Sequence, residues 1–399
     1  MKVVFYSQHV LGVGHFFRSL TLAAGLAPDE VVLVSGGRQA PELKLPQNVR
    51  EVHLPSLSMD AAFRGLHTED GADVEVIKAA RRDMLLGVLE RERPDVFLIE
   101  LFPFGRKKFR FELEPALEAC RAAGPNGPAV VCSLRDILVE REDMQKYEHR
   151  VLATLEKWFD LVLVHADQDV QCLDETFPRT SEIPVPVAYT GFVAERPAPG
   201  ARERGRAAAG LGPAEKLVVA SAGGGQVGFP LLNAAVEAFG LLADRPDYRL
   251  RVLTGPFMPE IEFARLKARA SDLPNVQVQR FEERFLDLLA AADLSISQAG
   301  YNTSMNVLAA KVPALVLPFD ANTEQARRAA KLEKLGALAV IGGHELFPQG
   351  LVARICEVLT KHPFAPSRQV NLDGAANSAI LLRRLVGKDS AQKPGKARR

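Results

Sequence analysis

Short apolar runs alternate with helix-like segments along the first half of the chain. The runs are continuous rather than alternating, which is typical of parallel strands covered on both faces of a sheet. The predicted strands are Lys2–Tyr6, Glu30–Val34, Val52–Leu54, Val96–Glu100, Ala129–Cys132 and Leu161–Val164. Between them, Arg18–Leu26 and Phe111–Ala122 have apolar positions at helical spacing. The alternation predicts βαβ units and a parallel sheet.

A second series of the same kind follows a break in the pattern. Residues 193–212 are rich in Pro, Gly, Ala and Arg, which favours a linker. The strands predicted after it are Leu217–Ala220, Leu250–Leu253, Val276–Gln279, Leu294–Ser297, Ala314–Leu317 and Ala337–Ile341. The pattern therefore predicts an α/β chain with two Rossmann-like doubly wound domains, 1–192 and 213–385, facing across a cleft. Residues 386–399 are polar and basic, and we expect them to be disordered.

Composition supports two globular domains and argues against several function classes. A chain of 399 residues is too long for one ordinary core. Its net charge is +1, from 50 Lys and Arg against 49 Asp and Glu, which gives no reason to expect nucleic-acid binding. The cysteines Cys120, Cys132, Cys172 and Cys356 form no CxxC pair, so we expect reduced thiols rather than a metal site or disulfides.

The chain ends and the apolar runs bear on location. The N-terminal residues MKVVFYSQHV form one short strand and lack the apolar core and cleavage site of a signal peptide. No apolar run approaches the roughly 20 residues that span a bilayer. We therefore expect a cytoplasmic protein, whose membrane contact, if it has any, is peripheral on the inner face.

Ligands of open α/β sheets bind beyond the carboxyl ends of the strands, and a glycine turn lies at such a place. Gly223, Gly224, Gly225 and Gln226 follow the first strand of the second series and precede a helix. Glycines let the backbone approach a phosphate, and the helix N-terminus supplies N–H groups. A flexible turn is the alternative, but three consecutive glycines cost stability, which favours phosphate binding. The Gly-Lys-Ser/Thr ending of a P-loop is missing.

A second polar segment opens the helix after strand Leu294–Ser297. Its candidate ligand-binding residues are Gln298, Gly300, Asn302, Thr303, Ser304 and Asn306. The loop that follows the next strand runs from Pro318 through Asp320 and Asn322 to Glu324 and Gln325. An ordinary capped helix would explain the first segment alone. The two segments together indicate a site for a small anionic ligand.

The stretch from residue 294 to residue 325 resembles the donor-binding segment of the MurG-type N-acetylglucosaminyl transferases. It is more distantly similar to UDP-glucuronosyltransferases, which share the GT-B architecture. The resemblance implies that Gly300 and Thr303 lie near the donor diphosphate and that Glu324 and Gln325 recognise hydroxyls of the donor sugar. It also implies that Phe281 marks the place where backbone groups hold the nucleobase.

Asn306 departs from the pattern of this family. In the UDP-sugar members, the matching position carries a Glu that binds both ribose hydroxyls. An amide can still hydrogen-bond a diol, but without the strength of a charge-assisted bond. A UDP-sugar remains the first expectation, with a thymidine or guanosine diphosphate sugar as the alternative.

The first domain carries a turn, Gly12-Val-Gly14-His15-Phe-Phe-Arg18, after its first strand. It is a poor dinucleotide fingerprint, because phenylalanine replaces the third glycine. It resembles the Gly-Gly-His turn of MurG-type enzymes, which faces the acceptor. The resemblance implies that His15 is the first candidate for a catalytic base and that Gly14 and Arg18 bind the acceptor. A capping or packing histidine is the alternative.

Other charged residues also follow strands of the first domain. Glu100 ends a strand and is the second candidate base, unless it pairs with an arginine of its own loop. Arg106 and Arg110 belong to a basic run interleaved with phenylalanines, which suits an anionic acceptor or a membrane surface, or else a solvated loop. Arg135 follows another strand and is a further acceptor-binding candidate. Asp167-Gln-Asp169 has the form of a metal-binding DxD string, but we expect helix capping there and no metal.

These features predict an inverting, metal-independent glycosyltransferase that needs no cofactor. A base in the first domain would take a proton from a hydroxyl or amine of a small-molecule, lipid or glycan acceptor, which then attacks a nucleotide sugar. A nucleotide-sugar 2-epimerase or hydrolase on the same fold would instead turn over donor without acceptor. A non-catalytic partner subunit is a third interpretation, to which Asn306 gives some support. The acceptor and the oligomeric state stay open.

Overall fold

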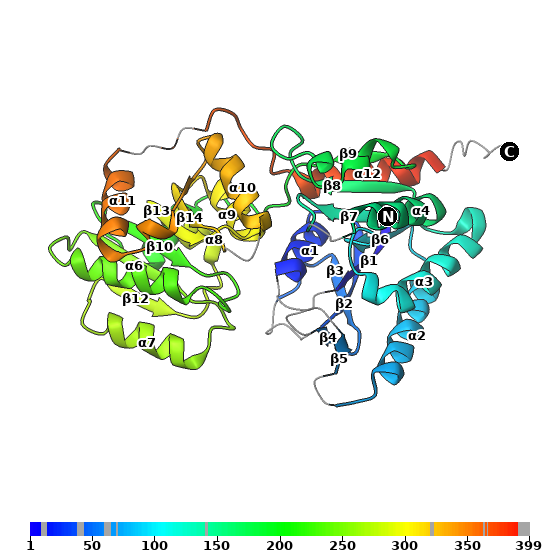
Figure 1. Cartoon of the computed structure of the whole chain (residues 1–399), viewed down its shortest axis with the longest axis horizontal. Coiled ribbons are helices and arrows are strands. Elements are labelled where there is room, and N and C mark those ends of the chain that lie inside the picture. Colours follow the sequence, from blue (N-terminus) through cyan, green and yellow to red (C-terminus); the bar gives the residue numbers. More distant parts are fainter. Residues whose placement is uncertain are drawn as a thin grey trace. The chain divides into compact units, whose positions relative to one another are not determined.

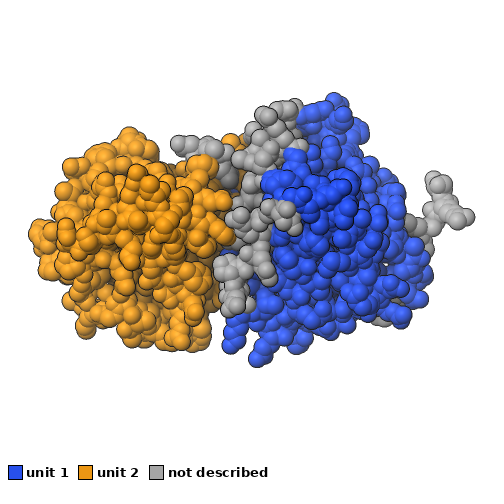
Figure 2. Space-filling view, turned by 90° about the horizontal axis from the view of Figure 1, so that it is seen from below, with its two compact units in different colours: residues 1–193, 371–399 blue, residues 194–370 orange. Residues whose placement is uncertain are grey.

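The computed structural model describes residues 1–8, 14–37, 44–59, 65–68, 71–139, 143–319, 323–361, 364 and 366–389. Gly12, Asp320, Asn322 and residues 390–399 of the expected tail lie outside these ranges. The chain divides into two compact units, coloured separately in Figure 2. Unit 1 comprises Met1–Val193 and Asn371–Arg399, and unit 2 comprises Ala194–Val370.

Unit 1 is built on a seven-stranded sheet with the order β3-β2-β1-β6-β7-β8-β9, in which all neighbours are parallel. The strands are β1 (Lys2–Gln8), β2 (Glu30–Gly36), β3 (Val49–His53), β6 (Val96–Glu100), β7 (Ala129–Arg135), β8 (Leu161–His165) and β9 (Val187–Tyr189). A separate antiparallel pair consists of β4 (Ser58–Met59) and β5 (Leu66–His67). All six strands predicted for this half are present. The chain order reverses between β1 and β6, which makes the carboxyl end of this pair the expected ligand-binding edge.

Helices cover both faces of this sheet (Figure 1). They are α1 (Gly14–Ala24), α2 (Val74–Glu92), α3 (Arg110–Ala122), α4 (Met144–Trp158) and α12 (Gly374–Asp389). α1 and α12 pack on Val3, Phe5 and Leu98 of one face. The start of α2 is fixed by a side-chain cap. The Asp73 carboxylate accepts a hydrogen bond from the backbone N–H of Glu75 at 2.8 Å.

Unit 2 contains a six-stranded parallel sheet with the order β12-β11-β10-β13-β14-β15. The strands are β10 (Lys216–Ser221), β11 (Tyr248–Leu253), β12 (Val276–Gln279), β13 (Leu294–Gln298), β14 (Ala314–Leu317) and β15 (Ala339–Val340). The helices are α5 (Ala201–Ala208), α6 (Phe229–Leu241), α7 (Glu260–Ala270), α8 (Phe285–Ala291), α9 (Tyr301–Ala310), α10 (Thr323–Lys334) and α11 (Pro348–Lys361). The six strands predicted for this half, and hence two doubly wound units, are confirmed.

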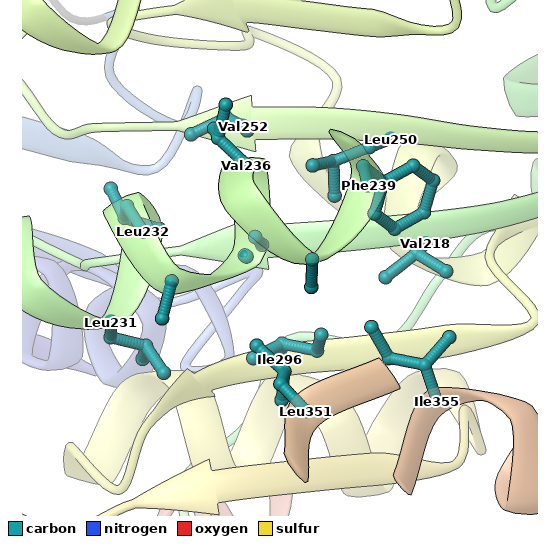
Figure 3. Close-up of a cluster of buried hydrophobic side chains, with 14 of the residues drawn as sticks. Val218, Leu231, Leu232, Val236, Phe239, Leu250, Val252, Ile296, Leu351 and Ile355 are labelled. Carbon is teal, nitrogen blue, oxygen red and sulfur yellow. The ribbon is translucent and has the colours of Figure 1, made fainter. Parts of the chain in front are cut away.

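One apolar core joins the sheet of unit 2 to α6 and α11. Figure 3 shows Leu232 and Phe239 of α6 packed among strand residues such as Ile296, with Ile355 of α11 on the same side. These side chains are almost fully buried. Burying an apolar side chain of this size contributes roughly 1.5–3 kcal/mol. The core therefore stabilises the sheet whose carboxyl edge carries the loops described below.

The segment expected to be a linker, residues 193–212, is largely part of unit 2. Its helix α5 packs closely on α8, because residue 205 is a glycine whose added Cβ would lie 2.0 Å from the Asp287 carbonyl oxygen. Arg204 pairs with the Asp287 carboxylate at 2.9 and 2.8 Å. The Pro, Gly, Ala and Arg content favoured a linker, whereas in the structure the Arg204 ion pair and the close packing at Gly205 hold α5 on α8.

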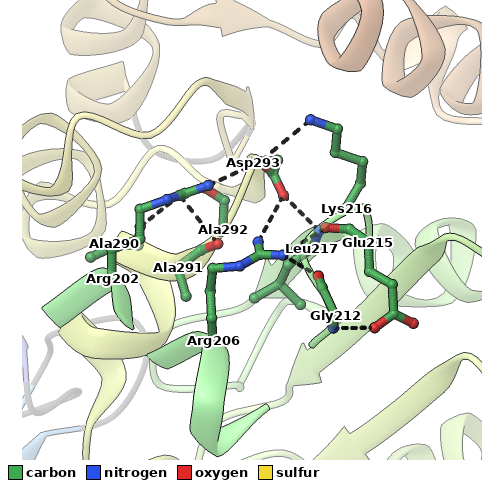
Figure 4. Close-up of polar contacts among 10 residues, drawn as sticks. All are labelled: Arg202, Arg206, Gly212, Glu215, Lys216, Leu217, Ala290, Ala291, Ala292 and Asp293. Carbon is green, nitrogen blue, oxygen red and sulfur yellow. Dashed lines mark hydrogen bonds and ion pairs between the residues drawn. The ribbon is translucent and has the colours of Figure 1, made fainter. Parts of the chain in front are cut away.

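Asp293, just before β13, binds two further arginines of this segment (Figure 4). Its carboxylate accepts the Leu217 backbone N–H at 2.9 Å and pairs with Arg202 at 3.3 Å and Arg206 at 3.7 Å. Arg202 also donates to the Ala290 carbonyl at 3.0 Å. Since cations are favourable at a helix C-terminus, Arg202 also stabilises the end of α8.

The predicted second domain, 213–385, ends too late. The chain returns to unit 1 after Val370, and α12 covers α1 with its buried Ala379 and Leu382. Arg383 pairs with Asp29 at 2.7 Å. α12 continues to Asp389, so residues 386–389 of the expected disordered tail are helical. The amphipathic pattern of α12 shows a helix, but it does not show against which sheet the helix packs.

The return crossing is held by main-chain hydrogen bonds within unit 1. The N–H of Phe192 donates to the Asn371 carbonyl at 2.8 Å, and the N–H of Gly374 donates to the Phe192 carbonyl at 3.0 Å. The Asp167 carboxylate accepts the Asn371 N–H at 2.8 Å. Within the described ranges, no helix is both long and apolar enough to cross a bilayer.

Candidate functional site

A buried carboxylate organises the ligand-binding edge of unit 1. Glu100 is the last residue of β6, beside β1, and its side chain is fully buried. Its Oε1 accepts hydrogen bonds from His15 Nδ1 at 2.7 Å and from Arg18 Nη2 at 2.5 Å. Both donors stand on the first turns of α1, which carries them to the carboxyl ends of β1 and β6. The sequence motif 14–18 and the strand end at residue 100 therefore meet in one cluster.

The second oxygen of Glu100 is also occupied. Arg106 donates to Oε2 through Nη2 at 3.0 Å and Nε at 3.3 Å. This is the pairing with a loop arginine that the sequence left as an alternative. A carboxylate that is wholly buried and engaged at both oxygens is poorly placed to take a proton from a ligand. It is well placed to hold His15.

The charges of this cluster set its protonation state. Burial would raise the pKa of Glu100, but His15, Arg106 and Arg18 hold it well below its usual range. Burial lowers the pKa of His15 to about 4, assisted by Arg106 and Arg135 and opposed by Glu100. At neutral pH the carboxylate is therefore charged and the imidazole is neutral. With Nδ1–H donated to Glu100, Nε2 keeps its lone pair, and the side chain of His15 is 27% exposed.

The remaining acceptor candidates divide into two groups. Gly14 begins α1 and is exposed, and Arg135 ends β7 within electrostatic range of His15. Arg110 instead pairs with Glu114 on α3, with Nε at 2.7 Å from Oε1. Arg106 thus joins the cluster, whereas the described contacts of Arg110 are with its own helix. The two arginines are four residues apart, and the short helix Lys107–Phe109 between them sends them to different surroundings.

Sequence reasoning missed a second buried network behind this edge. Arg81 of α2 donates to Glu112 of α3 through Nε at 2.9 Å and Nη2 at 2.7 Å, and both side chains are fully buried. Tyr6 donates to Glu112 at 2.5 Å, and Arg81 donates to Gln8 Oε1 at 2.7 Å. One signal was available, because Arg81 shares the helical spacing of the buried Leu85 and Val88.

The DxD string has a structural role. Asp167 accepts from the backbone N–H of Asp169 at 3.1 Å as well as from Asn371, in a turn rather than at a helix start. Nearby His165 is buried between Ser133 Oγ at 2.8 Å and Thr190 Oγ1 at 2.9 Å. Among the residues with described positions, no group of three or more His, Cys, Asp or Glu is arranged to hold a metal ion.

In unit 2, the glycine turn follows β10 as expected. Gly223 and Gly225 have φ values of 56° and 94°, and a Cβ on Gly225 would lie 2.4 Å from the Thr254 carbonyl oxygen. The turn therefore needs glycine at both positions. Gly223, Gly224 and Gln226 are exposed, so their backbone is accessible to a ligand.

The start of α9 lies against this turn. Gln298 donates from Nε2 to the Val227 carbonyl at 3.1 Å, and the Cβ position of Gly223 lies 4.0 Å from Thr303 Oγ1. Gly300 is the N-cap, and no described atom apart from its chain neighbours lies within 4 Å of its Cβ position. The first N–H groups of a helix lack helical partners, so this open N-terminus suits an anion.

Further candidate residues surround the open N-terminus. Asn302, Thr303 and Asn306 are half-buried on α9. Ser304 is buried, and its Oγ has no hydrogen-bond partner among the described atoms. The structure therefore brings the glycine turn and the polar start of α9 together.

The other donor candidates stand on neighbouring elements. Glu324 and Gln325 lie in the first turn of α10, Glu324 is buried, and Gln325 Oε1 accepts the Phe319 backbone N–H at 3.1 Å. Phe281 follows β12 with its ring exposed, and its carbonyl accepts from Gln279 Nε2 at 3.2 Å. All lie at or just beyond the carboxyl ends of the strands.

The chain is similar to known proteins in sequence and in fold. Residues 219–380 match the model of the glycosyltransferase family 28 C-terminal domain. A sequence relative from Symbiobacterium thermophilum is a UDP-N-acetylglucosamine–N-acetylmuramyl-(pentapeptide) pyrophosphoryl-undecaprenol N-acetylglucosamine transferase, 28% identical over 192 residues. The match covers 47% of this chain and 50% of that relative, so the chain spans about half the length of the curated relatives it matches.

Two solved structures share the fold over nearly the whole chain. MurG of Acinetobacter baumannii has a TM-score of 0.55 at 15% identity and covers 98% of this chain and 100% of its own. A protein described as a UDP-N-acetylglucosamine 2-epimerase of Listeria monocytogenes has a TM-score of 0.58 at 14% identity, with 99% and 98% covered. The chain therefore has the GT-B fold that MurG shares, and within it residues 219–380 match the glycosyltransferase family 28 C-terminal domain model.

Proposed function

We propose that the chain is an inverting glycosyltransferase that works without a metal ion. It would move a sugar from a nucleotide-diphosphate sugar, held by unit 2, to a hydroxyl or amine of an acceptor, held by unit 1. The observation that carries the proposal is the His15–Glu100 pair. A neutral, partly exposed imidazole held by a buried carboxylate is the arrangement that general-base catalysis requires.

His15 is the proposed base, and Glu100 is the residue that orients it. Nε2 of His15 takes the proton as the acceptor oxygen or nitrogen bonds to the anomeric carbon and the bond to the diphosphate breaks. Glu100 stabilises the imidazolium that forms, while Arg18 and Arg106 keep Glu100 ionised. A positioned base typically contributes a factor of ~10²–10⁴ in rate. A single displacement of this kind inverts the configuration at the anomeric carbon.

Unit 2 supplies the stabilisation of the leaving group in this proposal. The N–H groups at the start of α9 and the exposed backbone of the glycine turn would accept the negative charge that develops on the diphosphate. Glu324 and Gln325 would bind hydroxyls of the sugar, and the backbone near Phe281 would bind the nucleobase. These dipoles are fixed before the reaction, which is why we expect no metal to be required.

The donor proposed first is a UDP-sugar. The curated relative named above is described as a transferase of UDP-N-acetylglucosamine. Asn306 keeps a thymidine or guanosine diphosphate sugar as the alternative, because its amide binds a ribose diol more weakly than a carboxylate would. A lipid-linked acceptor follows from the name of the same relative and is proposed on that ground alone.

A nucleotide-sugar 2-epimerase is the second candidate, because a protein described in that way shares the fold. The two functions differ in their need for an acceptor. An epimerase or hydrolase consumes donor alone, whereas a transferase releases nucleoside diphosphate at an appreciable rate only when an acceptor is present.

The proposal is tested in EDTA by measuring UDP release and by chromatography that separates the donor from its 2-epimer. The chain is incubated with UDP-N-acetylglucosamine, with and without N-acetylmuramyl-pentapeptide pyrophosphoryl-undecaprenol. Acceptor-dependent release that drops at least ~10²-fold in His15→Ala supports the proposed base. His149→Ala, at an exposed histidine of unit 1, is the matched control and should keep full activity. Acceptor-dependent release at an unchanged rate in His15→Ala would refute the assigned base, and donor turnover without acceptor would favour the epimerase.

A further inference from the structure

A buried arginine touches the turn that leads into α9. Arg328 of α10 is 4% exposed, and its Nη1 donates to the Ala299 carbonyl at 3.3 Å. Its guanidinium carbon lies 5.3 Å from the centre of the Tyr301 ring. These contacts fall on either side of Gly300, the N-cap of α9. One side chain therefore holds both ends of the turn that the function proposed above assigns to the donor diphosphate.

Arg328 is also a neighbour of the sugar-binding candidate Glu324 on α10. Glu324 and Arg328 are four residues apart on α10, and both belong to its buried face. Residues at this spacing are neighbours on a helix surface. Arg328 thus stands between the carboxylate proposed to bind the sugar and the turn proposed to bind the phosphates.

The electrostatics of this position suit an anionic ligand. A helix N-terminus carries partial positive charge, so a cation beside it is unfavourable. A buried guanidinium also loses hydration, and an anion beside it offsets that cost. A diphosphate at the open N-terminus would be attracted by both the guanidinium and the α9 N–H groups.

We propose that Arg328 is a positioning residue of the donor site, which fixes the Ala299–Tyr301 turn for a diphosphate and couples it to α10. The proposal rests on the function proposed above. It assigns the second unit a recognition element that depends on the number of phosphates and not on the nucleobase. Tyr301 takes part through its ring, which supports the flat face of the guanidinium.

The test is a series of affinities for uridine, UMP, UDP and UDP-N-acetylglucosamine, measured by calorimetry in EDTA. In the unchanged protein, affinity should rise with each phosphate. In Arg328→Gln, the UDP affinity should fall about tenfold or more while uridine binds as before, because a charge-assisted interaction is removed. Arg328→Lys should recover only part of the loss, since lysine keeps the charge but lacks the planar group. Tyr301→Phe should bind UDP normally, and Tyr301→Leu should bind it more weakly.

Controls separate this inference from the function on which it rests. Arg265→Gln makes the same change at an exposed position of α7 and should leave every affinity unchanged. An equal loss for uridine and UDP in Arg328→Gln would show a merely structural role and overturn the inference, as would no loss for either. If the unchanged protein bound no nucleotide of the uridine, thymidine or guanosine series, the proposed donor site itself would be refuted.

Discussion

At the scale of single residues, the decisive contrast is between Glu100 and His15. Both carboxylate oxygens of Glu100 accept hydrogen bonds, whereas among the described contacts His15 is hydrogen-bonded only through Nδ1. The sequence offered both as bases, because both stand beyond strands of the first sheet. The contacts distinguish them, since Glu100 is buried with His15, Arg18 and Arg106 around it. Such a cluster joins residues 15, 18, 100 and 106, and no local pattern reveals that they meet. The sequence placed each residue near the end of a strand, whereas the proposed division of roles rests on the contacts in the structure.

The pH dependence of kcat/KM follows from this cluster. The base must be neutral, and the pKa of His15 in the free protein is lowered to about 4. Activity should therefore be flat as the pH falls from 7 and decline only below about pH 4, with the fold monitored by fluorescence. Glu100→Gln should lower the rate. It should not move the acidic limb of the pH profile to higher pH, because the Glu100 carboxylate raises the pKa of His15. A limb centred near the ordinary histidine value would contradict the account.

The buried Arg81–Glu112 pair should be important for stability. Replacing Arg81 with Met leaves the Glu112 charge without its ion-pair partner, which should lower the free energy of unfolding by ~3–5 kcal/mol in a urea titration. The double variant with Glu112→Leu should recover much of this loss. As a control on the same helix, Lys78→Met breaks the pair with Glu75, whose side chain is 77% exposed, and should cost no more than ~1 kcal/mol. Similar losses for both helix variants would argue against the buried network.

At the scale of secondary-structure elements, continuous apolar runs were sufficient to predict twelve strands. β9 was missed because its three residues are only half-buried and follow no long apolar run. Residues 193–212 were misassigned for a different reason. Their Pro, Gly, Ala and Arg content is typical of a linker, but Arg202, Arg204 and Arg206 bind carboxylates and carbonyls of unit 2.

Docking of α5 on α8 predicts a specific effect of a small substitution. Gly205→Ala places a methyl group 2.0 Å from the Asp287 carbonyl oxygen and 2.8 Å from the Ala291 Cβ. The unfolding free energy of unit 2, followed by circular dichroism, should fall by ~1–3 kcal/mol. The methyl group of Gly240→Ala in α6 meets no atom of the described residues within 4 Å, so this change should be neutral or stabilising by up to ~1 kcal/mol. An unaffected Gly205→Ala protein would show that α5 is not packed as described.

At the scale of the whole molecule, the chain is two doubly wound units with a terminal helix that returns to the first. Two series of βα elements could be predicted from the sequence, because each strand and helix shows its own pattern. The return of α12 could not, since the choice of sheet depends on Leu382 and Ala379 fitting beside α1. Asn371 and Phe192 secure that return through main-chain bonds, which leave no trace in a sequence pattern.

Trp158 makes the return of α12 testable. It is the single tryptophan of the chain, and it is buried in unit 1. Leu382→Ala should shift the urea transition seen by its fluorescence, with a loss of ~2–5 kcal/mol, although the substitution lies far away in sequence. Ile380→Ala, at an exposed position of the same helix, should change it by no more than ~0.5 kcal/mol. If Leu382→Ala left the urea transition of Trp158 fluorescence unchanged, α12 would not pack on unit 1 as described.

The most direct test of the account is a thermal-shift titration of the whole chain with UDP, TDP, GDP and CDP in the presence of EDTA. The account predicts that at least one of them binds without a metal ion. At 100 times its Kd, that nucleotide should stabilise the fold by ~2.7 kcal/mol. No stabilisation by any of the four, or stabilisation that requires added divalent metal, would contradict a metal-independent nucleotide-sugar site in unit 2.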